Sequence, residues 1–237
     1  MELDREQVIA RVGEAQSRLA RRRSSGAAIT QMLEVDSNGD PMDTPNLRGD
    51  HDLNEEGMRP APPLKPAAVL VPLVEHGAGF TVLLTQRSPD LRAHAGQISF
   101  PGGRAEPEDA SPEITALRET EEEVGLDRGI IEVVGRLDTY RTVTNYAVTP
   151  VVGIVRPDFA PIPDPYEVAE VFETPLAFLL DSRNHVRHSG WFNGTPRRWW
   201  AMPFGEYYIW GATAGMLMNL HARLADPDSI SPRQENS

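Results

Sequence analysis

The stretch Arg118–Leu126, with the sequence RETEEEVGL, places four carboxylates in the five positions from Glu119 to Glu123. It is predicted to form the C-terminal end of a helix. Acidic residues are unfavourable at this end, because the helix dipole favours cations there and like charges three and four residues apart repel each other. Some other feature of the fold must therefore compensate for the acidic run.

Three of these carboxylates, Glu119, Glu122 and Glu123, share one face of the predicted helix. At about 100° per residue they fall within roughly a 100° arc, so they can converge on one point beside the helix. Hard oxygen ligands gathered in this way suit Mg²⁺ or Mn²⁺. The alternative for a run of like charges is a solvated acidic face. The residues upstream of the run favour the metal site.

A glycine turn precedes the acidic run in Phe100–Arg104, with the sequence FPGGR. Gly102 and Gly103 allow a backbone turn too tight for larger residues, which leaves main-chain carbonyls and amides open to a ligand. Asp109 follows, and Ser111–Pro112 is predicted to supply the N-cap and the first residue of the helix. The predicted order is strand, glycine turn, loop and acidic helix.

The segment Gly103–Leu126 resembles the Nudix box, G-x5-E-x7-R-E-U-x-E-E-x-G-U, whose family hydrolyses nucleoside diphosphates linked to another moiety. The family positions at its catalytic end are filled by Arg118, Glu119, Glu122, Glu123, Gly125 and Leu126. The match departs in three places. Asp109 stands for the first Glu, eight residues rather than seven separate it from Arg118, and Thr120 replaces an aliphatic residue.

A second resemblance accounts for the longer spacing. The stretch Leu83–Gly103, LLTQRSPDLRAHAGQISFPGG, fills every fixed position of L-L-T-x-R-[SA]-x3-R-x3-G-x3-F-P-G-G. This pattern is similar to the extra signature of the coenzyme A pyrophosphatase branch of the Nudix family, whose boxes share the longer spacing between Asp and Arg. The likeness covers about residues 66–224.

The resemblance implies an α/β fold, the Nudix α/β/α sandwich with a mixed sheet between helices. It also implies Mg²⁺- or Mn²⁺-dependent hydrolysis of coenzyme A or an acyl derivative into 3′,5′-ADP and (acyl-)4′-phosphopantetheine. One alternative is hydrolysis of another dinucleotide, such as ADP-ribose, NADH or a dinucleoside polyphosphate, since the same metal helix serves all of these. Another is a non-catalytic nucleotide-binding regulator, against which the intact acidic residues argue.

The acidic helix is expected to supply the catalytic groups. Glu119 and Glu123, one turn apart on the same face, are the first candidates for metal ligands, in agreement with the family, and Glu122 is a further ligand or the general base. Arg118 is expected to pair with a helix carboxylate and orient it. A carbonyl of the turn Gly102–Gly103 is a further candidate ligand.

The substrate phosphates are expected to meet Arg87, Arg92 and His94, because arginine forks match phosphate oxygens. A structural salt bridge at a strand end is the alternative for Arg87, and a structural role is the alternative for His94. Glu167 and Glu170 are candidates for an additional carboxylate above the metal, with a solvated strand edge as their alternative.

Composition narrows the class of protein. The 237 residues, 40% of them hydrophobic, can bury one substantial core. A net charge of −12 argues against a sequence-independent grip on DNA or RNA. The absence of cysteine excludes disulfides, thiolate catalysis and zinc–cysteine sites. The expected partner is a small nucleotide of the coenzyme A type rather than nucleic acid or a membrane, and a homodimer is left open.

Four regions are expected along the chain: an N-terminal helix in residues 1–23, a flexible linker or arm at 24–65, the Nudix domain at 66–225 and a disordered tail at 226–237. Periodicity predicts strands at 67–74, 80–86, 130–137, 147–155, 168–172, 185–191, 197–201 and 207–210. No apolar run approaches the ~20 residues of a membrane helix. The acidic N-terminus fits neither a secretory signal nor a transit peptide, so a cytoplasmic protein is expected.

Overall fold

A computed structural model describes residues 3–13, 48–54, 63–192 and 194–225 of the protein. The expected N-terminal helix is present at residues 5–13. Its expected continuation to residue 23, most of the expected linker and the expected tail lie outside the described residues.

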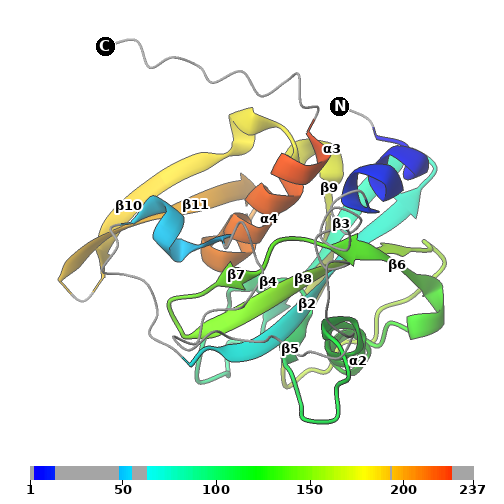
Figure 1. Ribbon diagram of the computed structural model, residues 1–237, viewed down its shortest axis with the longest axis horizontal. Coiled ribbons are helices and arrows are strands. Elements are labelled where there is room, and N and C mark those ends of the chain that lie inside the picture. The colour runs from blue at the N-terminus through cyan, green and yellow to red at the C-terminus, as the bar shows by residue number, and fades with distance from the viewer. Residues whose placement is uncertain (1–2, 14–47, 55–62, 193, 226–237) are drawn as a thin grey trace, which may run out of the picture.

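In the described part of the chain, a mixed sheet of nine strands forms the centre of the molecule (Figure 1). Neighbouring strands follow the order β1-β7-β8-β2-β3-β4, while β5 pairs with β2, β6 with β8 and β9 with β3. The strands are β1 (Arg48–Gly49), β2 (Lys65–His76), β3 (Gly79–Arg87), β4 (Ile98–Ser99), β5 (Gly102–Arg104), β6 (Ile131–Arg136), β7 (Tyr140–Arg141), β8 (Tyr146–Val155) and β9 (Val168–Pro175). The helices are α2 (Pro112–Val124), α3 (Leu176–Leu179) and α4 (Gly211–Leu224), with short 3-10 turns at Asp50–Leu53, Arg128–Ile130 and Ser182–Asn184.

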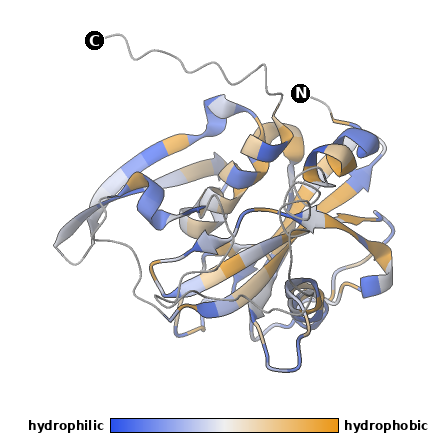
Figure 2. Cartoon of the chain, in the orientation of Figure 1, coloured by the Kyte–Doolittle hydropathy of each residue, from blue (hydrophilic) through white to orange (hydrophobic). Residues whose placement is uncertain are grey.

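The apolar run expected as a buried strand lies in β2, which pairs parallel with β8 and antiparallel with β3. Successive side chains of a strand point to opposite faces of the sheet. Ala68 and Leu70 therefore face one side and Val71 and Leu73 the other, and all four are fully buried. Hydrophobic residues gather along these central strands in Figure 2. A strand buried on both faces requires a layer on each side of the sheet.

Helices supply both layers. On one face, Ala116 of α2 packs with Leu70. On the other face, Leu220 of α4 and Val8 of the N-terminal helix belong to the same core as Leu73. The expected α/β/α sandwich with a mixed sheet is confirmed. No helix among the described residues combines the length and the apolar character needed to cross a membrane.

A second sheet of three antiparallel strands lies beside α4 (Figure 1). Its strands are β10 (Val186–Phe192), β11 (Thr195–Phe204) and β12 (Tyr207–Trp210). Met202 and Ile209, both fully buried, join this sheet to the core. All three strands were expected from the sequence, whereas their separation from the central sheet was not.

Residues 48–54 correct part of the expected flexible linker. β1 pairs with β7, and Asp50 accepts a hydrogen bond from the hydroxyl of Tyr140 at 2.8 Å. Asn54 exchanges two hydrogen bonds with the backbone of Arg198, at 2.8 and 3.0 Å. These contacts offset the ordering entropy of a segment whose polar composition predicted flexibility. The other domain boundaries stay predictions.

Candidate active site

The acidic run lies at the C-terminal end of α2, as expected. Ser111 is the N-cap, Pro112 is the first helical residue, and Gly125 ends the helix in the left-handed conformation at φ 68°. The last turn contains no basic residue. The helix dipole is therefore not balanced by a cation of the helix itself.

Backbone amides of the loop between β8 and β9 cap this end of the helix. The amide of Ile162 donates to the carbonyl of Val124 at 2.9 Å, and the amide of Asp164 donates to the carbonyl of Glu123 at 2.9 Å. Both carbonyls would otherwise lack a partner within the helix. The loop thus satisfies the end of α2 beside the acidic side chains.

The two glycines lie directly against α2, but not in the expected turn: Gly102 and Gly103 belong to strand β5, which pairs antiparallel with β2. Gly102 has a φ of 146°, and a Cβ there would come within 2.5 Å of the backbone of Ala68 and Val69. A Cβ on Gly103 would collide with the carboxylate of Glu119. Glycine is therefore required at position 102 by the backbone of the neighbouring strand, whereas a side chain at position 103 would displace the flexible end of Glu119.

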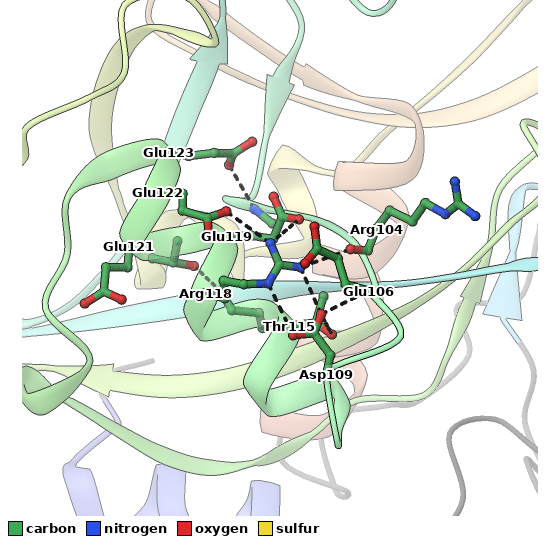
Figure 3. A network of polar contacts seen from close by, with 12 residues as sticks. Arg104, Glu106, Asp109, Thr115, Arg118, Glu119, Glu121, Glu122 and Glu123 are labelled. Carbon is green, nitrogen blue, oxygen red and sulfur yellow. Dashed lines mark hydrogen bonds and ion pairs between the residues drawn. The ribbon is translucent and has the colours of Figure 1, made fainter.

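Arg118 lies at the centre of a network of carboxylates (Figure 3). Its Nε and Nη2 donate to the two oxygens of Asp109 at 3.2 and 2.9 Å. Its Nη1 donates to Glu119 and Glu122, both at 3.0 Å. Its Nη2 also donates to the carbonyl of Arg104 at 3.2 Å. Arg118 thus pairs with two helix carboxylates, which is the contact expected of a residue that orients them.

Asp109 belongs to this network and is buried, with 4% of its surface exposed. It also accepts hydrogen bonds from the hydroxyl of Thr115 at 2.9 Å and the amide of Glu106 at 3.0 Å. The hydrogen bond from Arg118 is the main cause that lowers the pKa of Asp109 to about 2. The aspartate that replaces the first Glu of the Nudix box is therefore an ionised partner of Arg118.

Glu123 is the most buried acid of the run, with 5% of its surface exposed. The amide of Gly102 donates to its Oε2 at 3.0 Å, and Nη1 of Arg87 lies 3.8 Å from its Oε1. Burial raises the pKa of Glu123 to about 7, although both of these partners lower it. An ionised Glu123 therefore lacks sufficient compensating positive charge.

Two further carboxylates increase this deficit. Burial raises the pKa of Glu119, and the charges of Glu122 and Glu167 raise it further against the lowering effect of Arg118. Glu167, with Glu119, also raises the pKa of Glu123. Glu119, Glu123 and Glu167 therefore form a group of negative charges that destabilise one another.

The donor set fits a divalent cation in its chemistry. Carboxylate oxygens are hard ligands, and a cation would remove the repulsion among these three residues. In the present arrangement Glu119 is turned toward Arg118 and Glu123 toward Gly102. Accordingly, no group of three acidic or histidine side chains within the described ranges is arranged to hold a metal ion as it stands. The side chains would have to turn toward the ion.

A family model described as the NUDIX domain matches residues 63–193, more than half of the chain. The chain belongs to the Nudix family. It is accordingly a Nudix hydrolase, an enzyme that acts on pyrophosphate bonds. NudL of Escherichia coli K12, an uncharacterized Nudix hydrolase, is 44% identical over 154 residues, which cover 65% of this chain and 80% of that protein.

Solved Nudix structures are more distant. The NUDIX domain of Shewanella oneidensis NrtR, complexed with ADP ribose, is 22% identical with a TM-score of 0.43, over 73% of this chain and 95% of that one. An Ap4A hydrolase of C. elegans is 19% identical with a TM-score of 0.41, over 47% of this chain and 80% of that one. Likenesses at this distance carry no argument about the substrate.

The Nudix site brings most of the predicted residues together. The residues joined by contacts at the end of α2 are Arg118, Glu119, Glu122, Glu123, Gly102, Gly103 and Arg87. Glu122 is the most open of the three candidate ligands, with 59% of its side chain exposed, whereas 18% of the Glu119 side chain is exposed. The catalytic roles of these residues stay predictions.

Three other predicted residues are not joined to the acidic cluster. Arg92 and His94 lie on the exposed loop between β3 and β4, and His94 pairs with the side chain of Gln97 at 2.9 Å. No ion pair or hydrogen bond links Arg92 or His94 to the acidic cluster within the part of the chain that the structure describes. Glu170 accepts a hydrogen bond from the hydroxyl of Tyr207 at 2.7 Å.

Sequence reasoning missed two supports of the site. The hydroxyl of Thr115 holds Asp109, and the spacing of six residues between them is a signal that could have suggested this contact. Ile162 and Asp164 cap α2 from a proline-rich loop, and nothing in that loop's composition indicates a contact with a helix that ends about 40 residues earlier.

Proposed function

We propose that this Nudix hydrolase cleaves the pyrophosphate bond of coenzyme A or its acyl derivatives, with Mg²⁺ or Mn²⁺, into 3′,5′-ADP and (acyl-)4′-phosphopantetheine. The proposal deepens the family assignment by naming the substrate and the metal. It assigns the site to the C-terminal end of α2 and to Gly102 and Gly103 of β5 beside it.

The proposal rests on one observation: residues from two different sequence signatures contact each other at one carboxylate. Arg87 and Gly102 belong to the stretch that resembles the coenzyme A pyrophosphatase signature, and Glu123 belongs to the Nudix box. Arg87 lies 3.8 Å from Glu123, and the amide of Gly102 donates to Glu123 at 3.0 Å. The residues that suggest the substrate are therefore neighbours of the residues that suggest the chemistry.

Each acidic residue has a proposed task. Glu119 and Glu123 hold the metal, because they are the least exposed acids of the run and have raised pKa values. When bound, a divalent metal neutralises phosphate oxygens and lowers the pKa of a coordinated water. Glu122, which is more open to solvent, accepts the proton of the attacking water or adds a further ligand. Arg118 is a positioning residue that holds Glu119 and Glu122.

The remaining predicted residues are proposed to bind the substrate. Arg87 contacts the pyrophosphate from the end of β3, where a guanidinium can donate two parallel hydrogen bonds to phosphate oxygens. Arg92 and His94 contact the 3′-phosphate from the loop that follows. Gly102 and Gly103 of β5 offer backbone groups close to the same point.

A substrate panel tests the proposal. The purified protein is incubated with coenzyme A, its acyl esters, dephospho-coenzyme A, NADH, ADP-ribose and a dinucleoside polyphosphate, each with Mg²⁺ or Mn²⁺, and the products are identified by mass spectrometry. The proposal predicts a kcat/KM for coenzyme A above that for dephospho-coenzyme A and NADH. A preference for ADP-ribose, NADH or the dinucleoside polyphosphate would move the enzyme to the alternative substrate class.

A further inference from the structure

Two arginines approach the acidic residues of the candidate site, and they are held in opposite ways. Arg118 is locked, since it donates hydrogen bonds to Asp109, to Glu119 and to a backbone carbonyl. Arg87 is loose. Its Nη1 lies 3.8 Å from Oε1 of Glu123, beyond hydrogen-bond distance, and its buried Nε has no hydrogen-bond partner among the described residues.

The backbone of Arg87 is fixed although its guanidinium is not. Arg87 is the last residue of β3, and the register with β9 shifts between Gln86 and Arg87. A bulge of this kind redirects a side chain. The next amide, that of Ser88, donates to the carbonyl of Glu167 at 2.8 Å. The structure thus fixes the base of the Arg87 side chain beside the acids and leaves its charged end weakly bound.

Glu123 needs a positive charge on the side where Arg87 lies. Only 6% of its side chain is exposed, and its Oε2 already accepts a hydrogen bond from the amide of Gly102. Its other oxygen, Oε1, is the one nearest to Arg87. Glu119 and Glu167 add negative charge nearby. The guanidinium of Arg87 is therefore the counter-charge of Glu123 in the protein alone.

We propose that Arg87 is a stand-in cation, which neutralises Glu123 until a divalent cation takes its place and which then turns to a phosphate group of the substrate. The inference rests on the proposed function. Arg87 and a divalent cation repel each other at the same carboxylate, so Arg87 leaves Glu123 when the cation binds. Its donors then become available to an anion, and a pyrophosphate is the anion that the same site accepts.

This exchange predicts two effects of opposite sign. Removing the guanidinium of Arg87 removes a competitor for Glu123, so the affinity for a divalent cation without nucleotide should increase. It also removes a phosphate ligand, so the kcat/KM for the substrate should fall. A fixed salt bridge or a fixed substrate-binding arginine would also oppose the cation through its charge. Neither would release Arg87 from Glu123 when the cation binds, and the Nε–H resonance of Arg87 in the wild type reports that release.

The experiment compares wild type, Arg87→Met and the control Arg128→Met by calorimetric titration with Mn²⁺ alone, followed by kinetics with coenzyme A or the best-cleaved substrate of the panel. Arg128 is a suitable control because it lies after α2 and its Nε donates at 2.7 Å to Glu121, an exposed acidic residue of α2. Arg87→Met should bind Mn²⁺ about threefold to tenfold more tightly, with a kcat/KM lower by at least about tenfold. Arg128→Met should match the wild type in both.

The possible failures are distinguishable. Equal or weaker Mn²⁺ binding by Arg87→Met, with normal binding by the wild type, overturns the inference and leaves the proposed function in place. Absence of Mn²⁺ binding by the wild type overturns the proposed function itself. If Arg87→Met does not fold, the exchange is tested in the wild type through the NMR resonance of the Arg87 Nε–H. This resonance should shift when Mg²⁺ is added, and an unchanged resonance at saturating Mg²⁺ overturns the exchange.

Discussion

Asp109 and Arg118 form a bidentate ion pair between the loop before α2 and the helix itself, with Nε to Oδ1 at 3.2 Å and Nη2 to Oδ2 at 2.9 Å. The side chains are 4% and 15% exposed. The remaining nitrogen of Arg118 reaches Glu119 and Glu122. This pair therefore fixes the arginine that positions two of the acidic residues.

Replacing Asp109 by Asn should destabilise the fold by about 3 kcal/mol, because one partner of a buried ion pair is left without its counter-charge. Urea denaturation at pH 7 measures the change. Glu121→Gln is the matched control, since it breaks the exposed pair with Arg128 and should change stability by no more than about 0.5 kcal/mol. Equal stability of Asp109→Asn and Glu121→Gln would show that the buried pair does not stabilise the fold.

Stability should fall with rising pH because of Glu123. Its pKa is about 7 in the folded protein and 4.5 as the ordinary value, so the folded state binds more protons between these values. The stabilising proton is fully present below about pH 4.5 and is lost as the pH rises through 7. The free energy of unfolding of Glu123→Gln, taken relative to that of the wild type, should therefore rise by about 3 kcal/mol between pH 4 and pH 8 without divalent metal.

Denaturation of both proteins at pH 4, 6 and 8, in a chelating buffer, measures this gain. The lowered pKa of Asp109 acts in the opposite sense, because its stabilisation is present above about pH 4 and is lost as the pH falls through 2. That effect is common to both proteins and cancels in the difference. A difference that stays constant with pH would contradict the assignment to Glu123.

Glu119→Gln and Glu123→Gln should each reduce turnover by roughly 10² to 10³-fold, since each removes a proposed metal ligand. The fold should remain intact, which circular dichroism checks. Glu121→Gln is again the control, because Glu121 points away from the cluster in Figure 3. Near-normal turnover in either active-site variant, measured at saturating metal, would refute its role as a ligand.

The two glycines of β5, Gly102 and Gly103, should respond differently to alanine. Gly102→Ala should destabilise the fold by about 2 kcal/mol, because its φ is 146° and its Cβ would meet backbone. Gly103→Ala should mainly reduce turnover, because the new Cβ would displace the carboxylate of Glu119, the end of a flexible side chain. Gly77→Ala, with open space around its Cβ, is the control and should be neutral within about 1 kcal/mol. Melting temperature and kcat, measured on all three, separate the two responses.

The sequence predicted the central architecture well, because apolar periodicity and glycine turns act locally. The strand at β2 and the acidic helix α2 are where the patterns placed them. The separation of β10–β12 into their own sheet depends on which strands pair, and short-range patterns do not encode this. Residues 48–54 were wrongly assigned to a flexible linker because their order comes from distant partners such as Tyr140.

In the candidate site, too, features set by local sequence patterns were predictable and features set by loop conformation were not. The grouping of Glu119, Glu122 and Glu123 follows from helical periodicity. The two glycines lie beside the helix as expected and Gly102 contacts Glu123, but they form part of strand β5 rather than the predicted turn. The positions of Arg92 and His94 depend on the conformation of an exposed loop, which the signature does not specify.

The central claim is that the acidic end of α2 uses a divalent cation to cut coenzyme A at its pyrophosphate. The most direct test is mass spectrometry of the products formed from coenzyme A by wild type and Glu123→Gln, with Mg²⁺, with Mn²⁺ and with chelator. The account predicts 3′,5′-ADP and 4′-phosphopantetheine from the wild type with metal alone, and almost none from Glu123→Gln. Intact coenzyme A in every wild-type reaction, or equal cleavage by the variant, would contradict it.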